Sequence, residues 1–233
     1  MPLINYIGNR QESLGAGAGG FVRGLAPSPP PLIIDYIIVG GGAAGTGVSG
    51  PGGSAGGVRS GSAASMSFAT TIDIIVGAGG ITGSRNGFSS SMSGSSFAFI
   101  GAGGATGNSG QPTEFSQGVS GPGSTQGGGA GSSKNGNDGA LNQNGDGGTG
   151  SAWLDGKWYA GGGGGVGNTG NPGYPGLGGG GTAQAGIGPD GLTYQLNGYN
   201  GRGGGAASTG TSGGSDIEII RYNKLYFLLI LIY

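Results

Sequence analysis

Glycine limits what this chain can fold into more than any other residue type. It supplies 66 of the 233 residues, roughly four times its usual share of about 7 %. Glycine has no side chain to bury, and it loses more backbone freedom on folding than any other residue. Disordered chains usually stay soluble through charge, but only 8 % of these residues are charged and the net charge is −1. We therefore expect the glycine segments to be ordered by hydrogen bonds between backbones.

Apolar runs rich in β-branched and aromatic residues interrupt the glycine. The four clearest runs are Leu32–Val39, Met66–Val76, Ser96–Ile100 and Asp216–Tyr222. Two of them alternate in part between apolar and polar positions, and no segment has helical periodicity, so each run predicts a β-strand. A weaker hairpin is predicted over Ala152–Ala160, where Asp155-Gly156 is a turn signal between two tryptophan-bearing arms. The predicted fold class is all-β, with little or no helix.

Three arrangements compete for the glycine runs between these strands. Collagen needs glycine at every third position and much proline, but here the phase breaks repeatedly and there are only 11 prolines. A flexible linker is the second alternative, although linkers do not usually carry Val, Ile, Trp and Tyr within them. The third is a packed layer of extended, polyproline-like glycine segments with three residues per turn, whose backbones hydrogen-bond to one another. We favour this glycine-rich layer, framed by the short strands.

Composition divides the chain into three parts. Residues 1–31 end in a cluster of prolines that favours a stiff, extended spacer. We interpret them as an attachment arm, with Tyr6 as a candidate contact, and a frayed terminus is the alternative. Residues 32–222 form the glycine-rich β domain, and residues 223–233 form an apolar strand. No secretory signal is recognised at the start of the sequence, because the first ten residues lack an apolar segment.

The residue types that most enzymes use are scarce. The chain has no histidine and no cysteine, which removes the commonest general base, the commonest metal ligand and every thiolate site. Serines are plentiful, but the lysines and carboxylates that could activate one are scattered. With 9 basic and 10 acidic residues, no basic patch indicates nucleic-acid binding. We expect no enzyme activity, no cofactor and no metal.

One motif resembles a dinucleotide-binding fingerprint. Gly40, Gly42 and Gly45 follow an apolar strand with the required spacing. The third glycine should open a helix that holds the pyrophosphate, but TGVSGPGGSAGG follows, and the first acidic residue after the motif is Asp73, beyond the expected spacing of about 20 residues. Since the pattern also arises by chance in so glycine-rich a chain, we reject a nucleotide site.

A second motif resembles a calcium-binding loop. Asn142, Asn144, Asp146 and Gly147 align with the start of the EF-hand template, but Trp153 then falls where the bidentate glutamate should stand. We interpret the run as a solvated loop.

Aromatic residues in the second half of the chain lie in Gly/Asn/Ser segments rather than in the strands. The candidates for receptor binding are Tyr174, Tyr199, Trp158, Tyr159 and Tyr194, and Phe115 and Trp153 share the same kind of setting. Tyrosine and tryptophan among small polar neighbours are typical of recognition surfaces and binding hot spots. The alternative is that these rings cover the glycine layer and serve as its core. Among them, we expect Tyr174 and Tyr199 to be exposed.

The run Leu225–Tyr233 is apolar at every position. Its nine residues are too few for a helix that crosses a bilayer, which needs about 20, so we expect no membrane span. Left in water it would be an aggregation hazard. We expect it to be buried against another subunit or a partner protein, with Phe227, Leu229 and Leu231 at the interface. Extended chains that cannot bury their own edges assemble, so we expect a homo-oligomer, a trimer.

The order of these segments resembles the glycine-rich domain family of bacteriophage tail fibres and related virion proteins. The opening motif DYIIVGGGAAG, the internal TIDIIVGAGG and SFAFIGAGG, the stretch WYAGGGGGVGNTGNPG and the closing GGSDIEIIRY carry the likeness over residues 32–222. Asp216 and Glu218 depart from the usual apolar closing strand. Distal adhesins of T-even-like phages are similar in their polyglycine runs, which implies packed glycine helices with recognition loops.

This resemblance implies a tail-fibre or adhesin component that attaches a virion to its host. Its partners would then be other virion proteins and a glycan or outer-membrane protein on the host surface, and it would be made in the host cytoplasm and carried on the particle. A capsid decoration protein and a glycine-rich extracellular matrix protein remain the alternatives.

Overall fold

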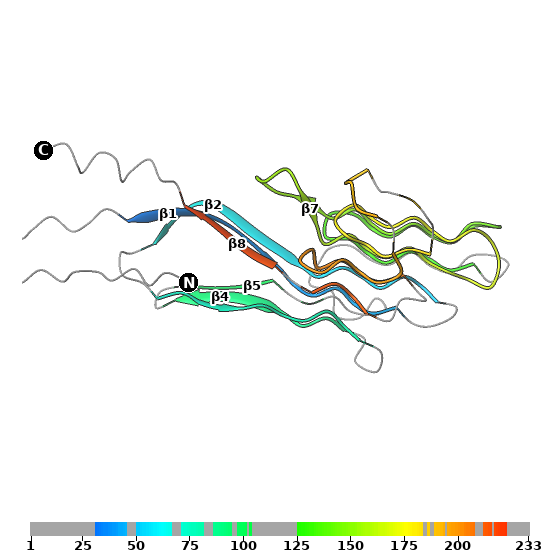
Figure 1. Ribbon diagram of the computed structural model, residues 1–233, viewed down its shortest axis with the longest axis horizontal. Helices are drawn as coiled ribbons and strands as arrows, with labels where there is room; N and C mark the ends of the chain where they lie inside the picture. Colours follow the sequence, from blue (N-terminus) through cyan, green and yellow to red (C-terminus); the bar gives the residue numbers. More distant parts are fainter. Residues whose placement is uncertain are drawn as a thin grey trace, which may run out of the picture. The chain divides into compact units, whose positions relative to one another are not determined.

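The structure is a computed structural model (Figure 1). It describes residues 31–45, 50–66, 71–81, 86–94, 97–101, 103, 125–183, 186, 189–193, 195–207, 212–215 and 217–222. All of these lie in the second of the two units into which the chain divides, Pro31–Tyr233. The sites predicted at Tyr6, Tyr194, Phe227, Leu229 and Leu231 lie outside the described residues, and so does Phe115. The predicted roles of the arm and of the apolar run stay predictions.

All regular structure in the described residues is β-strand. The strands are β1 (Leu32–Val39), β2 (Val58–Met66), β3 (Asp73–Ile75), β4 (Ser90–Gly94), β5 (Phe97–Gly101), β6 (Ser151–Ala152), β7 (Trp158–Tyr159) and β8 (Ile217–Tyr222). They form three antiparallel sheets with the orders β2-β1-β8, β3-β4-β5 and β6-β7. The all-β prediction is confirmed. No helix in this part of the chain is long and apolar enough to cross a membrane.

Three predicted strands and the hairpin appear where the sequence placed them. Leu32–Val39 is β1, and β5 and β8 lie within one residue of their predicted bounds. The prediction of one strand over Met66–Val76 is wrong. Met66 ends β2, and Asp73–Ile75 forms β3. Strands β2 and β4 were not predicted, since VRSGSAASM has a single β-branched residue, Val58, and SSMSG has no branched or aromatic residue to mark a strand. Their pairing partners, rather than their own propensities, make them strands.

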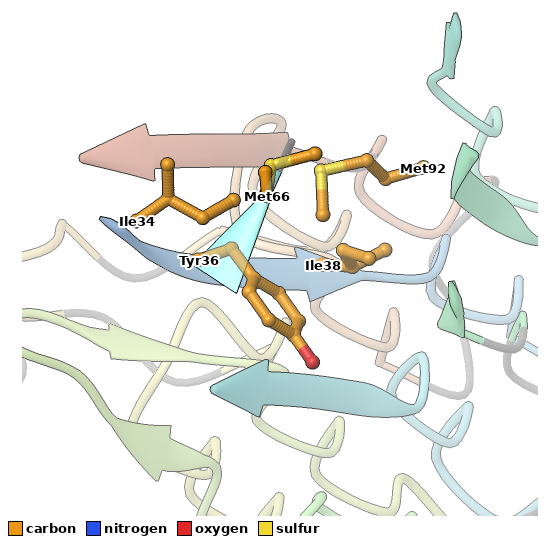
Figure 2. Packing of buried hydrophobic residues seen from close by; sticks show 5 residues of the cluster. All are labelled: Ile34, Tyr36, Ile38, Met66 and Met92. Atoms are coloured by element: carbon orange, nitrogen blue, oxygen red, sulfur yellow. The ribbon is translucent and has the colours of Figure 1, made fainter. Parts of the chain in front are cut away.

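Strand β1 is buried on both faces, which explains why it is apolar at almost every position. On one face Ile34, Tyr36 and Ile38 gather with Met66 and Met92 to form the first core cluster (Figure 2). A bulge between Ile34 and Tyr36 interrupts the pairing with β2. There the Asp35 carboxylate accepts a 2.9 Å hydrogen bond from the backbone N–H of Ala63.

The opposite face of β1 builds a second cluster. Ile37 and Val39 pack with Ala55, Tyr159 and Ala160, all of them at most 2 % exposed. Tyr159 belongs to the short hairpin β6-β7, so this cluster joins the central strand to a segment 120 residues further along the chain. The two clusters place a small conventional core around β1 and leave the rest of the described domain to glycine.

The glycine segments form a packed lattice in which hydrogen bonds repeat every three residues. The clearest case is Gly161–Gly165, whose successive N–H groups point to three different neighbours in turn. The acceptors, in order, are the carbonyls of Gly178, Gly148, Gly53, Gly181 and Gly145. Positions three apart therefore reach the same neighbour, as expected of an extended helix with three residues per turn.

Other segments follow the same rule. Gly52 and Ala55 donate to the run that begins at Gly127, while Gly53 and Gly56 donate to the run 203–206. In Figure 1 these segments run side by side as long, wavy ribbons beside the sheets. The packed-layer hypothesis is confirmed, and the flexible-linker alternative is wrong for the described glycine runs. Residues 40–45, the apparent dinucleotide fingerprint, continue β1 into this lattice rather than opening a helix.

Close approach of backbones explains why the lattice needs glycine. A Cβ atom on Gly163 would lie 1.9 Å from the carbonyl oxygen of Ala206, and one on Gly56 would lie 1.7 Å from that of Gly40. Real Cβ atoms essentially never come within 3.0 Å of such a neighbour. The close approach that lets these backbones hydrogen-bond therefore leaves no room for side chains.

Candidate recognition surface

The five aromatic candidates occupy different environments in the structure. Tyr174 is 51 % exposed, Trp158 and Tyr199 are partly exposed, and Tyr159 is 1 % exposed. Tyr194 lies outside the described residues. Of the described four, only Tyr174 is exposed, as predicted for it. The expectation that Tyr199 would also be exposed holds only in part.

Tyr159 supports the core rather than a recognition surface. Its ring lies in the second core cluster, and the Arg202 guanidinium stands over it at 5.0 Å from the ring centre. Its hydroxyl donates a 2.6 Å hydrogen bond to Asp155 Oδ2. Burial, followed by this bond and the negative charge of Asp155, raises the pKa of Tyr159 above its ordinary value. The predicted alternative, in which a ring covers the glycine layer, is the one that this residue follows.

Asp155 closes the hairpin turn that holds Tyr159. Its Oδ1 accepts a 3.0 Å hydrogen bond from the Lys157 backbone N–H, and Gly156 takes a φ of 77°. Burial alone would raise the pKa of this carboxyl, but the Tyr159 hydroxyl and the Lys157 N–H, helped by the charges of Lys157 and Arg202, outweigh burial and lower the pKa. The Arg202 guanidinium also donates a 2.6 Å hydrogen bond to the Trp158 carbonyl. Trp158 is thus part of the fixed hairpin.

We expect Tyr159→Phe to lower the free energy of unfolding by about 1 kcal/mol at neutral pH, a modest figure because Asp155 is solvent-exposed. The folded pKa of Asp155 is lowered, so its contribution is present above the unfolded pKa of about 4 and is lost as the pH falls through the folded value. The folded pKa of Tyr159 is raised, so its contribution is lost only above about pH 10. Urea titrations of both proteins across pH measure this difference. A gap that stays constant down to about pH 2 would contradict the assignment.

Tyr199 braces the turn in which it lies. Its backbone N–H donates a 2.9 Å hydrogen bond to the Gly179 carbonyl, and its hydroxyl donates to the Thr193 carbonyl. Gly179 has a φ of 89°, and a Cβ atom added to it would lie 2.9 Å from the Cβ of Tyr199 and 2.8 Å from the Cβ of Arg202. Tyr199 is therefore tied to the lattice through its backbone and to the loop through its hydroxyl. These contacts indicate a structural role for Tyr199.

An open groove with a volume of about 320 Å³ lies beside Tyr174. Three segments and one proline form its walls. The lining residues are Lys134, Asn135, Asn137, Asp146, Gly147, Thr149, Tyr174, Pro175, Gly176, Leu177 and Pro189. We call this the Tyr174 groove. It combines one positive and one negative side chain, amides and a hydroxyl with an aromatic ring, which suits a polar ligand without a large net charge.

The lattice fixes the floor of the Tyr174 groove. The Tyr174 backbone N–H donates a 2.7 Å hydrogen bond to Asp146 Oδ1, and the Gly147 N–H donates a 2.8 Å bond to the Tyr174 carbonyl. A Cβ atom on Gly147 would lie 2.0 Å from the carbonyl oxygen of Gly162, and one on Gly176 would lie 1.9 Å from that of Gly148. The loop that carries the exposed ring is therefore held by backbone contacts that leave little freedom. Such a preformed site loses little entropy when it binds.

Sequence reasoning missed the role of Asn144. This side chain is 1 % exposed, and its Oδ1 accepts a 2.7 Å hydrogen bond from the Gln126 N–H. Its Nδ2 donates to the carbonyls of Thr169 at 3.1 Å and Asn171 at 2.9 Å. The interpretation of this asparagine-rich run as a solvated loop is wrong at Asn144. The same run that suggested a calcium loop instead joins three segments of the lattice.

Comparison with known proteins gives one match. Searches of curated proteins and of solved structures find nothing similar to this chain. The model of the glycine-rich domain family matches residues 25–223, a range that covers every described strand and the whole lattice. This match confirms the predicted likeness to a glycine-rich domain, and the chain belongs to the glycine-rich domain family.

Proposed function

We propose that this protein is a structural component of a virion, a tail-fibre or adhesin subunit that attaches the particle to the host surface. The observation that carries the proposal is the Tyr174 groove, a half-exposed aromatic ring on a loop that is hydrogen-bonded directly to a glycine lattice. The motifs that resemble phage tail fibres supply the biological setting. Membership of the glycine-rich domain family is compatible with this proposal but does not by itself indicate a virion protein.

The lattice suits the demands on an attachment protein. Its segments are held by backbone hydrogen bonds to several neighbours, so they need few large side chains to stay ordered. Side chains in the connecting loops are then available for recognition, which is the usual division between a rigid scaffold and functional loops. In this proposal the arm at residues 1–31 docks on the particle, the subunits form a homo-oligomer, and the loops of the glycine-rich domain face the host.

Replacing Tyr174 with Ala tests the recognition site. We expect particles that carry Tyr174→Ala to adsorb to host cells about tenfold more slowly or worse, because aromatic anchors dominate binding energy. Leu141→Ala is the matched control, since it shortens a loop side chain that is 69 % exposed and does not line the groove. Equal adsorption by the Tyr174→Ala particles and the wild type would exclude the groove as the attachment site. Competition by purified host glycan or by outer-membrane protein would separate the two receptor classes.

The position of the protein on the particle tests the proposal more broadly. Antibody labelling of purified particles should mark the tail fibres or their tips. Labelling over the whole shell would favour a capsid decoration protein instead. A protein that never co-purifies with particles would overturn both.

A further inference from the structure

The sheets β2-β1-β8 and β3-β4-β5 enclose the first core cluster, and the described side chains cover this core on one side only. On the side of β2 and β5, the ring of Phe99 stacks on Tyr36 at 4.7 Å between centroids and on Phe97 at 5.5 Å. The Arg59 guanidinium lies 5.1 Å from the centre of the Phe99 ring. These contacts cover the core where the edges of the two sheets meet.

The side of β3 and β8 has no comparable cover among the described residues. On β3 and just after it, Ile74 is 47 % exposed, Ile75 is 62 % exposed and Val76 is 54 % exposed. Ile72 and Ile220 pack against the core cluster and are only partly buried. In its sheet β3 has a neighbouring strand on one side only, so it presents a free edge beside an apolar surface. Such an edge usually needs to be paired or covered.

Sheet order places β3 and β8 on the same side. Strand β5 lies against β1 and β2, and β4 lies against β1. In their sheets β3 is the edge strand next to β4, and β8 is the edge strand next to β1. These two edges therefore lie on the side opposite β2 and β5. Ile72, just before β3, and Ile220, in β8, contact the same core cluster, which agrees with this arrangement.

We propose that the apolar run Leu225–Tyr233 of the same chain covers this side of the core as a further strand beside β3. The chain leaves β8 at Tyr222, opposite Ile34 at the edge of the core cluster. Packed sheets lie about 10 Å apart, a distance that about three extended residues span at about 3.3 Å each. Residues 223–225 are therefore long enough to cross from the sheet of β8 to the sheet of β3.

The composition of the run fits this place. Every residue from Leu225 to Tyr233 is apolar or aromatic, so whichever face of the strand meets the core is apolar throughout. One face would meet the core between the sheets near Ile74 and Ile220, and the other would extend the apolar surface at Ile75. The run follows β8 after only two residues, so its effective concentration at β3 exceeds that of a run from another subunit. The occupant is thus this chain's own run rather than the subunit or virion partner that the sequence alone suggested.

Cysteine cross-linking of the full chain tests the proposal directly. The protein has no cysteine of its own, so Ile75→Cys can be combined in turn with Leu228→Cys, Leu229→Cys or Ile230→Cys, which sample both faces of the proposed strand. We expect at least one pair to form a disulfide within one chain under mild oxidation, since neighbouring strands bring Cβ atoms within the required distance of about 4 Å. Leu154→Cys, on the exposed hairpin turn, combined with the same three changes, should not cross-link.

The nature of the disulfide decides the outcome. A disulfide between two chains, seen as a dimer on a non-reducing gel, would overturn the proposal in favour of a run supplied by another subunit. The absence of any cross-link to Ile75→Cys would overturn it as well. A second measurement does not depend on new cysteines: amide hydrogen exchange at Ile74–Val76 should be slow in the wild type. It should become faster by about tenfold or more in Leu229→Asp while β1 stays protected, and unchanged exchange in that variant would contradict the proposal.

Discussion

Gly163→Ala is expected to lower the free energy of unfolding by about 3 kcal/mol or more, which places it among the severe single substitutions. Gly163 lies in the middle of the lattice, where its N–H donates to the Gly53 carbonyl at 3.0 Å and its carbonyl accepts from the Gly129 N–H at 2.7 Å. The new methyl carbon would fall 1.9 Å from the Ala206 oxygen. The neighbours are backbone atoms held by their own hydrogen bonds, so they cannot move aside as a flexible side chain would. Urea or thermal unfolding measures the loss.

Gly156→Ala is the matched control for this prediction. It makes the same chemical change at a turn where nothing lies within 4 Å of the added atom. Only the left-handed backbone conformation, with a φ of 77°, opposes it, at a cost of about 1–2 kcal/mol. If the two variants were equally stable, steric exclusion would not be the reason for glycine in the lattice. A Gly163→Ala protein with an unchanged unfolding midpoint would refute the packing described for that segment.

The sequence predicted the general class of this fold but not its connections. Ile, Val and Tyr concentrated in Leu32–Val39 mark a strand, and Asp155-Gly156 marks a turn, because these signals are local. The abundance of glycine beside so little charge predicted an ordered lattice. The pairing of Gly163 with Gly53 depends on contacts between segments 110 residues apart. In a stretch where most residues are identical, no side-chain pattern distinguishes one register from another.

Two further failures have the same origin. Strands β2 and β4 consist mainly of serine, alanine and glycine, so only their pairing with β1 and β5 identifies them. The candidate recognition residues were chosen by residue type, and although Tyr174 was expected to be exposed, residue type left Tyr159 of the core among the candidates. Both lie in glycine-rich surroundings. What separates them is the hairpin that folds Tyr159 onto Val39, a contact that sequence spacing alone does not reveal.

The lattice also depends on a few polar side chains, of which Asn144 is the clearest. We expect Asn144→Leu, which keeps the number and branching of the side-chain heavy atoms, to cost about 3 kcal/mol or more. The change removes three side-chain hydrogen bonds, with the Gln126 N–H and the carbonyls of Thr169 and Asn171, while the Asn171 carbonyl keeps its bond from the Asn144 backbone N–H. The three bonds are partly buried, and each such bond contributes about 0.5–1.5 kcal/mol. Chemical denaturation of the variant and the wild type measures the difference.

Asn137→Leu separates this effect from a general intolerance of leucine in the lattice. Asn137 lies nearby and is exposed, and the hydrogen bond from its Nδ2 to Asp146 Oδ2 is long at 3.5 Å. Its backbone N–H and carbonyl keep their bonds to Asp146 and Gly128 whatever the side chain. We therefore expect a change within about 0.5 kcal/mol for this variant. If Asn144→Leu were equally mild, the three hydrogen bonds of Asn144 would not hold these segments together, and the glycine backbones alone would account for the stability of this end of the lattice.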